Sequence, residues 1–209
     1  TLNMKSSKIE AVIFDLGGVL VDWNPEYLYA KIFKNDTKKM TWFLNTICTP
    51  AWNMEQDAGR TFKEGAEILI LEYPEYEKEI RLFFERWEEM LYGEKEDTVL
   101  ILNLLSELNK VKLYALTNWS AETFPIAKQR FDFLKRFEGI VVSGEEKTRK
   151  PFSKIYKITL DRYRLHPENC LFIDDSIENV EAARVLGINA IHFTNALQLH
   201  VDLKKLELL

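Results

Sequence analysis

A short apolar stretch near the N-terminus that ends on a carboxylate constrains this chain most strongly. Residues 9–14 read IEAVIF, Asp15 follows directly, and Gly17 and Gly18 come next. The β-branched and aromatic residues predict a buried strand. A carboxylate at the C-terminal end of such a strand lies where α/β sheets bind ligands, and glycines let the backbone approach a ligand closely. Taken alone, Asp15 is more often a turn or capping residue, so the ends of the later strands decide between the two interpretations.

The rest of the chain alternates strands and helices, apart from one long segment. Further strands are predicted at residues 111–117, 139–143, 169–175 and 189–193, with helical patterns between them. This order predicts a parallel sheet with right-handed crossovers. Between Asn24 and about Tyr92 the spacing of apolar residues is helical and no comparable strand occurs. We therefore expect an all-helical insert of about four helices after the first strand.

Three local patterns describe the expected insert in more detail. Residues 49–60 are polar and predict a turn around Gly59. Thr61 and Glu64 have the spacing of a capping box at a helix start. Residues 74–92 place apolar side chains at helical spacing, which predicts one helix that ends at Gly93.

Composition excludes several classes of protein. The chain has 209 residues, of which 46% are hydrophobic, enough for a full core and a small second domain. Its formal net charge of -5 argues against nucleic acid or an anionic membrane as the main partner. No apolar run approaches the roughly 20 residues of a membrane-spanning helix. The first ten residues contain no hydrophobic signal region, which favours a cytoplasmic location, and two cysteines are too few for a disulfide framework.

Polar groups recur where the predicted strands end. They are Asp15, Thr117 with Asn118, Lys150 beyond Ser143, and Asp174 with Asp175. Each has a structural interpretation of its own, as a helix cap or a solvated loop charge. Because the carboxyl ends of parallel strands lie along one edge of a sheet, all of these groups can converge. Four such positions together favour a functional site.

The same residues resemble the motifs of the haloacid dehalogenase superfamily. FDLGGVLVD is similar to its first motif, LTN to its second, Lys150-Pro151 to its third and FIDDS to its fourth. The resemblance implies an α/β fold, with a Rossmann-like parallel sheet core at residues 1–22 and 96–209. An inserted helical cap would occupy residues 23–95. Among the members, the chain closely resembles bacterial sugar-phosphate phosphatases whose first motif also reads Asp-Leu-Gly. In relatives the peptide between the motif Lys and a following Pro is often cis, so we predict a cis Lys150-Pro151 bond.

The resemblance also implies catalytic roles for single residues. Asp15 would attack phosphorus and form an aspartyl-phosphate, which splits one difficult displacement into two easier steps. Lys150 and Thr117 would bind the phosphoryl oxygens and act in catalysis. Asn118 and Gly17 would assist in binding the substrate.

A metal ion is expected at the same edge of the sheet. Asp15, Asp174 and Asp175 would bring three carboxylates together, and their repulsion requires a cation. Ligands that are all oxygen indicate Mg²⁺, which keeps several waters and bridges to a substrate phosphate. By the resemblance, the carbonyl of Gly17 would be a further ligand.

One position departs from the pattern of the superfamily. Most of its phosphatases carry a second Asp two residues after the nucleophile, which protonates the leaving group and activates water, but this chain has Gly17 there. General acid–base catalysis is typically worth roughly 10²–10⁴-fold in rate. Asp22 on the same loop, or Glu55 and Asp57 from the insert, are the candidates to replace it.

Three functions therefore remain open from the sequence. The favoured one is a magnesium-dependent phosphatase that acts on a small phosphorylated metabolite, a sugar phosphate in particular, because a helical cap would exclude bulky substrates. The second is a 2-haloacid dehalogenase, which also needs a single Asp in its first motif. The third is a non-catalytic phosphate-binding or interaction protein, suggested by Gly17. The sequence does not indicate an oligomeric state.

Overall fold

The computed structural model describes residues 8–209 and is built around a five-stranded parallel sheet. The strand order is β5 (Gly139–Val142), β4 (Lys112–Thr117), β1 (Ala11–Phe14), β6 (Cys170–Asp174) and β7 (Asn189–His192). The expected α/β fold with a parallel sheet is confirmed. The predicted absence of a hydrophobic signal region, which favoured a cytoplasmic location, concerns mainly residues 1–7, and these lie outside the described residues.

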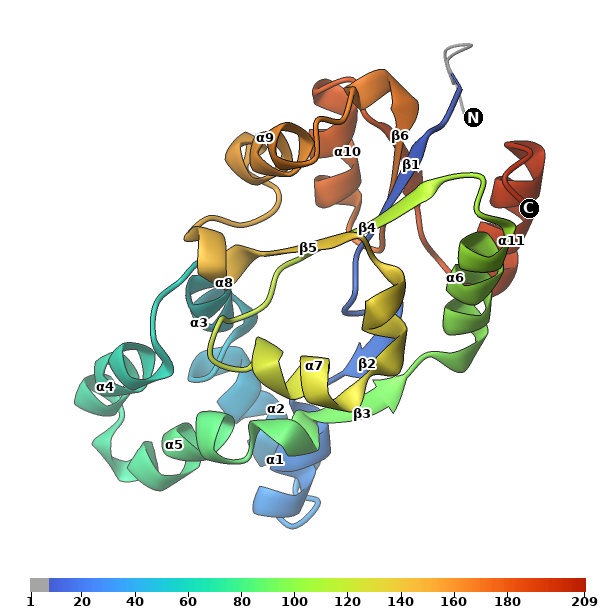
Figure 1. Cartoon of the computed structure of the whole chain (residues 1–209). Helices are drawn as coiled ribbons and strands as arrows, with labels where there is room; N and C mark the ends of the chain where they lie inside the picture. The colour runs from blue at the N-terminus through green and yellow to red at the C-terminus, as the bar shows by residue number, and fades with distance from the viewer. Residues whose placement is uncertain (1–7) are drawn as a thin grey trace.

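Helices cover both faces of this sheet (Figure 1). On one face lie α6 (Glu96–Leu108), α7 (Phe124–Arg130) and α11 (Ala196–Lys205), and on the other lie α9 (Ser153–Arg162) and α10 (Ile177–Val185). The alternation along β1 explains the two layers. Val12 and Phe14 pack into the core on the first face, whereas Ala11 and Ile13 pack into the core on the second. Within residues 8–209, no helix combines the length and apolarity needed to cross a bilayer.

The register of the central strands places the predicted functional residues side by side. Phe14 lies opposite Ala115 of β4 and Ile173 of β6. The backbone N–H of Asp15 donates to the carbonyl of Ile173 at 2.9 Å. The residues that follow these three positions therefore emerge together at the carboxyl edge of the sheet.

The chain leaves the sheet after β1 and returns to it at α6, and the segment between carries most of the remaining helices. We call residues 23–95 the cap. Its elements are α1 (Glu26–Ile32), α2 (Thr37–Thr46), α3 (Pro50–Asp57), α4 (Phe62–Glu72), η1 (Pro74–Tyr76), α5 (Glu77–Glu85) and η2 (Trp87–Met90). The short elements of the core are η3 (Asp132–Arg136), α8 (Ser143–Glu146) and η4 (Pro167–Asn169).

The expected turn around Gly59 is confirmed, since Ala58 and Gly59 form a turn and Gly59 has φ +110°. The residues before it form α3, a helix that the sequence did not indicate. The hydroxyl of Thr49 accepts a hydrogen bond from the N–H of Trp52 at 3.1 Å, and Pro50 occupies the first helical turn. Such an N-cap followed by proline starts a helix. Trp52 and Gln56 are buried on its inner side, so a polar residue at a buried position concealed the helical pattern.

The expected single helix over residues 74–92 was also wrong. The segment divides into η1, α5 and η2 and then enters a strand, β3 (Leu91–Glu94). β3 pairs antiparallel with β2 (Val21–Trp23), and Gly93 lies opposite Asp22 instead of ending a helix. The pairing partner is distant in sequence, which is why local periodicity did not indicate this ribbon.

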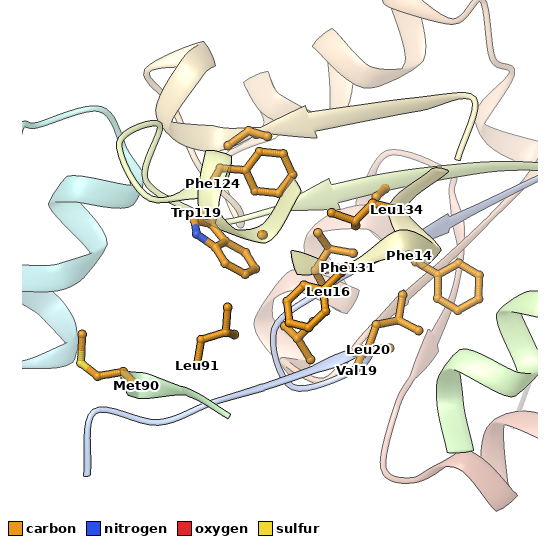
Figure 2. Packing of buried hydrophobic residues seen from close by; sticks show 14 of the residues in the cluster. Phe14, Leu16, Val19, Leu20, Met90, Leu91, Trp119, Phe124, Phe131 and Leu134 are labelled. Carbon is orange, nitrogen blue, oxygen red and sulfur yellow. The ribbon is translucent and has the colours of Figure 1, made fainter. Parts of the chain in front are cut away.

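Apolar side chains join the cap to the core around the loop after β1. Figure 2 shows Leu16, Val19 and Leu20 from this loop in one cluster with Phe131 and Leu134. Met90 and Leu91, at the end of the cap, belong to the same cluster. The loop that carries Asp15 is therefore held by packing from both parts of the molecule.

Polar and aromatic contacts reinforce this junction. The backbone N–H of Phe62 in α4 donates to Glu122 Oε1 at 2.8 Å. The guanidinium of Arg130 donates to the carbonyls of Leu91 and Tyr92, each at 2.6 Å. The rings of Trp87 and Trp119 lie 5.6 Å apart between centroids. These contacts bring the cap over the loops at the carboxyl edge of the sheet.

The capping box at the start of α4 is confirmed and can be tested. Thr61 Oγ1 accepts from the N–H of Glu64, and Glu64 Oε2 accepts from the N–H of Thr61, both at 3.1 Å. Thr61→Ala should lower the free energy of unfolding by about 0.5–2 kcal/mol. Thr61→Ser keeps the acceptor and should retain most of that stability. Urea unfolding measures both variants, and an equal loss in the two would contradict the assigned cap.

Candidate active site

A buried ammonium group joins the ends of three strands. Lys150 Nζ donates to Asp15 Oδ1 at 2.9 Å, to Asp174 Oδ2 at 2.7 Å and to the carbonyl of Leu116 at 2.9 Å. Lys150 is 1% exposed and Asp174 is fully buried. The sequence predicted that these groups would converge, and the structure brings Asp15, Lys150 and Asp174 into direct contact.

The ammonium and the carboxylates of this cluster shift one another's pKa. Burial by itself would lower the pKa of Lys150, but Asp15 and Asp174 outweigh burial and hold the pKa above its ordinary value, so the amine stays charged. Burial raises the pKa of Asp15, and Asp174 and Asp175 raise it further against the opposing effect of Lys150. One ammonium is therefore shared among more carboxylates than it can neutralise.

Backbone and amide donors fix the two buried carboxylates. Asp15 Oδ1 also accepts from the N–H of Leu16 at 2.8 Å. Asp174 Oδ1 accepts from the N–H of Ser176 at 2.8 Å, and Asn179 Nδ2 lies 3.2 Å from each oxygen of Asp174. Asn179 was not predicted from the sequence. Its position one turn into the helix that follows FIDDS is the signal that would have indicated it.

Asn118 holds the loop that delivers Lys150. Its Oδ1 accepts from the N–H of Lys150 at 2.9 Å, and its Nδ2 donates to the carbonyl of Lys150 at 3.0 Å. Both ends of the side-chain amide of Asn118 are thus engaged by the backbone of Lys150. The peptide between Lys150 and Pro151 is cis, as predicted.

Thr117 offers a hydroxyl group with no partner. It ends β4 next to Leu116, is 1% exposed, and its Oγ1 makes no hydrogen bond with any of residues 8–209. A buried polar atom left without a partner costs about 1–3 kcal/mol. It does not cap the next helix, since α7 begins only at Phe124 and has no side-chain cap. The hydroxyl is therefore available to an incoming oxygen.

A third carboxylate completes an acidic group at the edge of the sheet. Asp15, Asp174 and Asp175 each offer one oxygen, and these oxygens lie within 4.8 Å of one another. Asp175 is exposed, unlike the other two. Three carboxylate oxygens at this spacing fit a hard divalent cation such as Mg²⁺.

The two glycines after Asp15 differ in what they permit. Gly18 has φ +80°, and a Cβ atom there would lie 2.1 Å from Asp175 Oδ2, so only glycine fits. A Cβ atom at Gly17 would meet nothing within 4 Å. The absence of the second Asp of the superfamily at residue 17 is thus not imposed by space.

A cavity of about 300 Å³ lies beside these groups. Its lining comes from both parts of the chain: Gly17, Gly18, Trp23, Asn53, Asp57, Phe62, Trp87, Asn118, Trp119, Ser120, Thr123 and Asp175. Four aromatic side chains form its apolar wall. Trp23, one of these four, has a buried indole N–H with no hydrogen-bond partner among the described residues.

The three candidates for the missing acid lie in different surroundings. Asp22 is in β2 and accepts from the hydroxyl of Tyr27 at 2.8 Å. Glu55 is exposed on α3. Asp57 is half-buried at the end of α3 and lines the cavity together with Gly17 and Asp175. Among these three acids, the cavity lining includes Asp57.

Comparison with known proteins agrees with this geometry. A sesquiterpene phosphatase from Aspergillus oryzae is 28% identical over 203 residues, which cover 94% of this chain and 96% of that protein. A phosphorylated carbohydrates phosphatase from Thermotoga maritima is 28% identical and covers 88% of this chain and 84% of its own length. The crystal structure of a HAD family enzyme from Bacteroides thetaiotaomicron, in complex with magnesium and inorganic phosphate, is 24% identical with a TM-score of 0.66 over 89% of this chain and 94% of that chain.

The family comparison covers most of the chain. The model of the haloacid dehalogenase-like hydrolases matches residues 9–187. This span begins with the strand that leads to Asp15 and ends at the glycine that follows α10, so it contains all four motifs. The chain therefore belongs to the family of haloacid dehalogenase-like hydrolases.

Proposed function

We propose that this protein is a magnesium-dependent phosphatase that hydrolyses a small phosphorylated metabolite through an aspartyl-phosphate on Asp15. One observation carries the proposal: the Lys150 ammonium is buried between Asp15 and Asp174. The free hydroxyl of Thr117 and the third carboxylate, Asp175, lie at the same edge of the sheet. The names of the relatives from Aspergillus oryzae and Thermotoga maritima support phosphatase activity.

The hydrogen bonds of Asp15 favour it as the nucleophile. Among the described residues, the side-chain bonds from Lys150 and from the N–H of Leu16 both end on Oδ1. Oδ2 is left to attack phosphorus while Oδ1 stays fixed. Lys150 and Thr117 would then bind the phosphoryl oxygens, together with the backbone at Asn118 and Gly17, where negative charge develops.

A magnesium ion fits the acidic group. Asp15, Asp174 and Asp175 would hold it, with the carbonyl of Gly17 as a further ligand. When bound, the ion neutralises carboxylate and phosphate charge and so supplies the positive charge that Lys150 alone cannot provide. The carboxylate pair also argues against a 2-haloacid dehalogenase, since displacement of a halide from carbon needs no metal.

A sugar phosphate is the substrate class that we favour. Asn53 and Trp119 both line the cavity, where an amide group would bind sugar hydroxyls and an indole ring would pack against a sugar ring. The relative from Thermotoga maritima is named for phosphorylated carbohydrates. The cap covers the site, which disfavours phosphoproteins.

An apolar phosphate ester is the second candidate. The cavity is lined by Phe62, Trp87 and Trp119, and such a wall would bury a hydrocarbon leaving group. The relative from Aspergillus oryzae is named a sesquiterpene phosphatase. Sugar phosphates and prenyl phosphates therefore belong in the same substrate panel.

The proposal is tested by product release from that panel. With magnesium, the protein should release phosphate from sugar phosphates or prenyl phosphates, and chelation of the metal should abolish this release. 2-Chloropropionate is included as the dehalogenase substrate. Release of chloride without phosphate, or release of neither, would exclude a phosphatase.

Asp15→Asn tests the nucleophile. The substitution should abolish turnover, because an amide oxygen cannot form the covalent intermediate. Circular dichroism and the melting temperature should show a retained fold. Asp161→Asn, an exposed change on α9, is the control and should keep full activity. Unchanged activity of Asp15→Asn would contradict the mechanism.

Magnesium should also stabilise the folded protein. A ligand that binds only the native state at 100 times its Kd adds about 2.7 kcal/mol of stability, which raises the melting temperature. Asp175→Asn removes one ligand and should reduce this rise, whereas Asp161→Asn should leave it unchanged. A melting temperature that does not respond to magnesium in any of the three proteins would contradict the metal site.

A further inference from the structure

We propose that Asp57, the last residue of the cap helix α3, is the general acid and base of this phosphatase, in place of the Asp that is absent at residue 17. The inference rests on the proposed function and adds a catalytic residue to it. Asp57 would reach the leaving group from the cap, since it lines the same cavity as Gly17 of the loop that carries Asp15.

Asp57 lies beside the loops that would bind the phosphoryl group. Asp57 lines the same cavity as Gly17, Asn118 and Asp175. These three residues belong to the loops that carry Asp15, Thr117 and Asp174. A group bound to the phosphoryl moiety in this cavity would therefore meet Asp57 on the cap side.

α3 is held rigidly, so this position is well defined. The indole N–H of Trp52 donates to the carbonyl of Gly65 at 2.9 Å. Arg60 donates to Gln56 Oε1 at 2.7 Å and to the carbonyl of Trp52 at 3.1 Å. Just beyond the helix, a Cβ atom at Gly59 would lie 3.1 Å from Lys147 Cγ. The end of α3 is thus seated against the core loop that leads to Lys150.

The surroundings of Asp57 raise the pKa of its carboxyl group toward 7. Burial raises the pKa of Asp57 to about 7, against the opposing effects of Arg149, Lys150 and the backbone N–H of Ser120. The C-terminal end of a helix also disfavours a carboxylate. A pKa near the working pH lets one residue act as both acid and base.

The two nearby cations are engaged elsewhere. The guanidinium of Arg149 donates to the carbonyl of Lys150 at 3.0 Å and lies 4.7 Å from the ring centre of Phe152. The ammonium of Lys150 is shared by Asp15 and Asp174. Both cations act on Asp57 only through space, and burial outweighs their lowering effect on its pKa.

The proposed reaction has two steps. In the first, Oδ2 of Asp15 forms a bond to phosphorus, the bond from phosphorus to the leaving oxygen breaks, and the Asp57 carboxyl group gives its proton to that oxygen. In the second, the Asp57 carboxylate takes a proton from water as the water oxygen bonds to phosphorus. The bond between Asp15 and phosphorus then breaks, which releases inorganic phosphate and restores both residues.

Two aryl phosphates of similar shape test the acid step. 4-Nitrophenyl phosphate has a good leaving group that needs little help from an acid. The leaving group of phenyl phosphate is phenolate, which benefits from protonation because the pKa of a phenol is about 10. Asp57→Asn should lower kcat/KM for phenyl phosphate by about 10²-fold or more and lower it much less for 4-nitrophenyl phosphate. Glu55→Gln on the same helix and Asp22→Asn are matched controls and should reduce neither value appreciably.

Two further measurements separate catalysis from a structural role. For the wild type with phenyl phosphate, kcat/KM should fall as pH rises above about 7, and this fall should be absent in Asp57→Asn. Because the folded-state pKa of Asp57 is raised, the contribution of Asp57 to the free energy of unfolding falls as pH rises from about 4 through 7. Asp57→Asn should therefore melt at a higher temperature than the wild type at pH 8, and this advantage should vanish at pH 4.

The open space at Gly17 allows a rescue experiment. Adding Gly17→Asp to Asp57→Asn restores an acid where the superfamily places one. The double variant should have a kcat/KM for phenyl phosphate at least tenfold higher than that of Asp57→Asn alone. An equal loss for both aryl phosphates in Asp57→Asn would overturn the acid role, while the proposed function would stand as long as Asp15→Asn is inactive. Failure of the wild type to hydrolyse any phosphate ester would refute the proposed function, and the role of Asp57 with it.

Discussion

The ion cluster centred on Lys150 is the interaction on which the rest of the site depends. Its ammonium group contacts carboxylates that follow β1 and β6 and a carbonyl of β4, so one cation joins the three central strands. Removing charges from water is costly, and a buried pair repays that cost only when its geometry is good and its remaining hydrogen bonds are satisfied. Leu16, Ser176 and Asn179 supply those bonds. The cluster is therefore better understood as a preorganised site than as a source of stability.

The cap supplies part of the wall of the cavity beside the ion cluster. β2 and β3 form the ribbon through which the chain leaves and re-enters the core, and the cavity beside the ribbon is lined from both parts. Trp23 and Asp57 come from the cap side, whereas Asn118 and Asp175 come from the core. In this arrangement the core would bind the phosphoryl group, and the cap would determine which leaving group fits. Moving the acid from residue 17 to the cap would couple leaving-group recognition to proton transfer.

Much of the core could be predicted because its signals are local. The strand that ends at Asp15 is a short apolar run that periodicity identifies. In the cap, the capping box at Thr61 and Glu64 likewise follows from residue spacing. The cap was predicted less well. α3 was missed because the buried Gln56 conceals its apolar face, and β3 was missed because its partner, β2, lies about 70 residues earlier in the chain.

The sequence by itself determined the order of the main strands and helices of the core and the residues that end its strands, because apolar periodicity and turn chemistry act over a few residues. Tertiary structure alone decided how those residues meet. It assigned Asn118 to the backbone of Lys150, left the hydroxyl of Thr117 free, and placed Asp57 in the wall of the cavity. The physical reason is that hydrogen-bond partners and burial depend on groups distant in the chain. On an isolated helix the carboxyl group of Asp57 would be an ordinary surface acid, whereas burial in the folded protein raises its pKa to about 7.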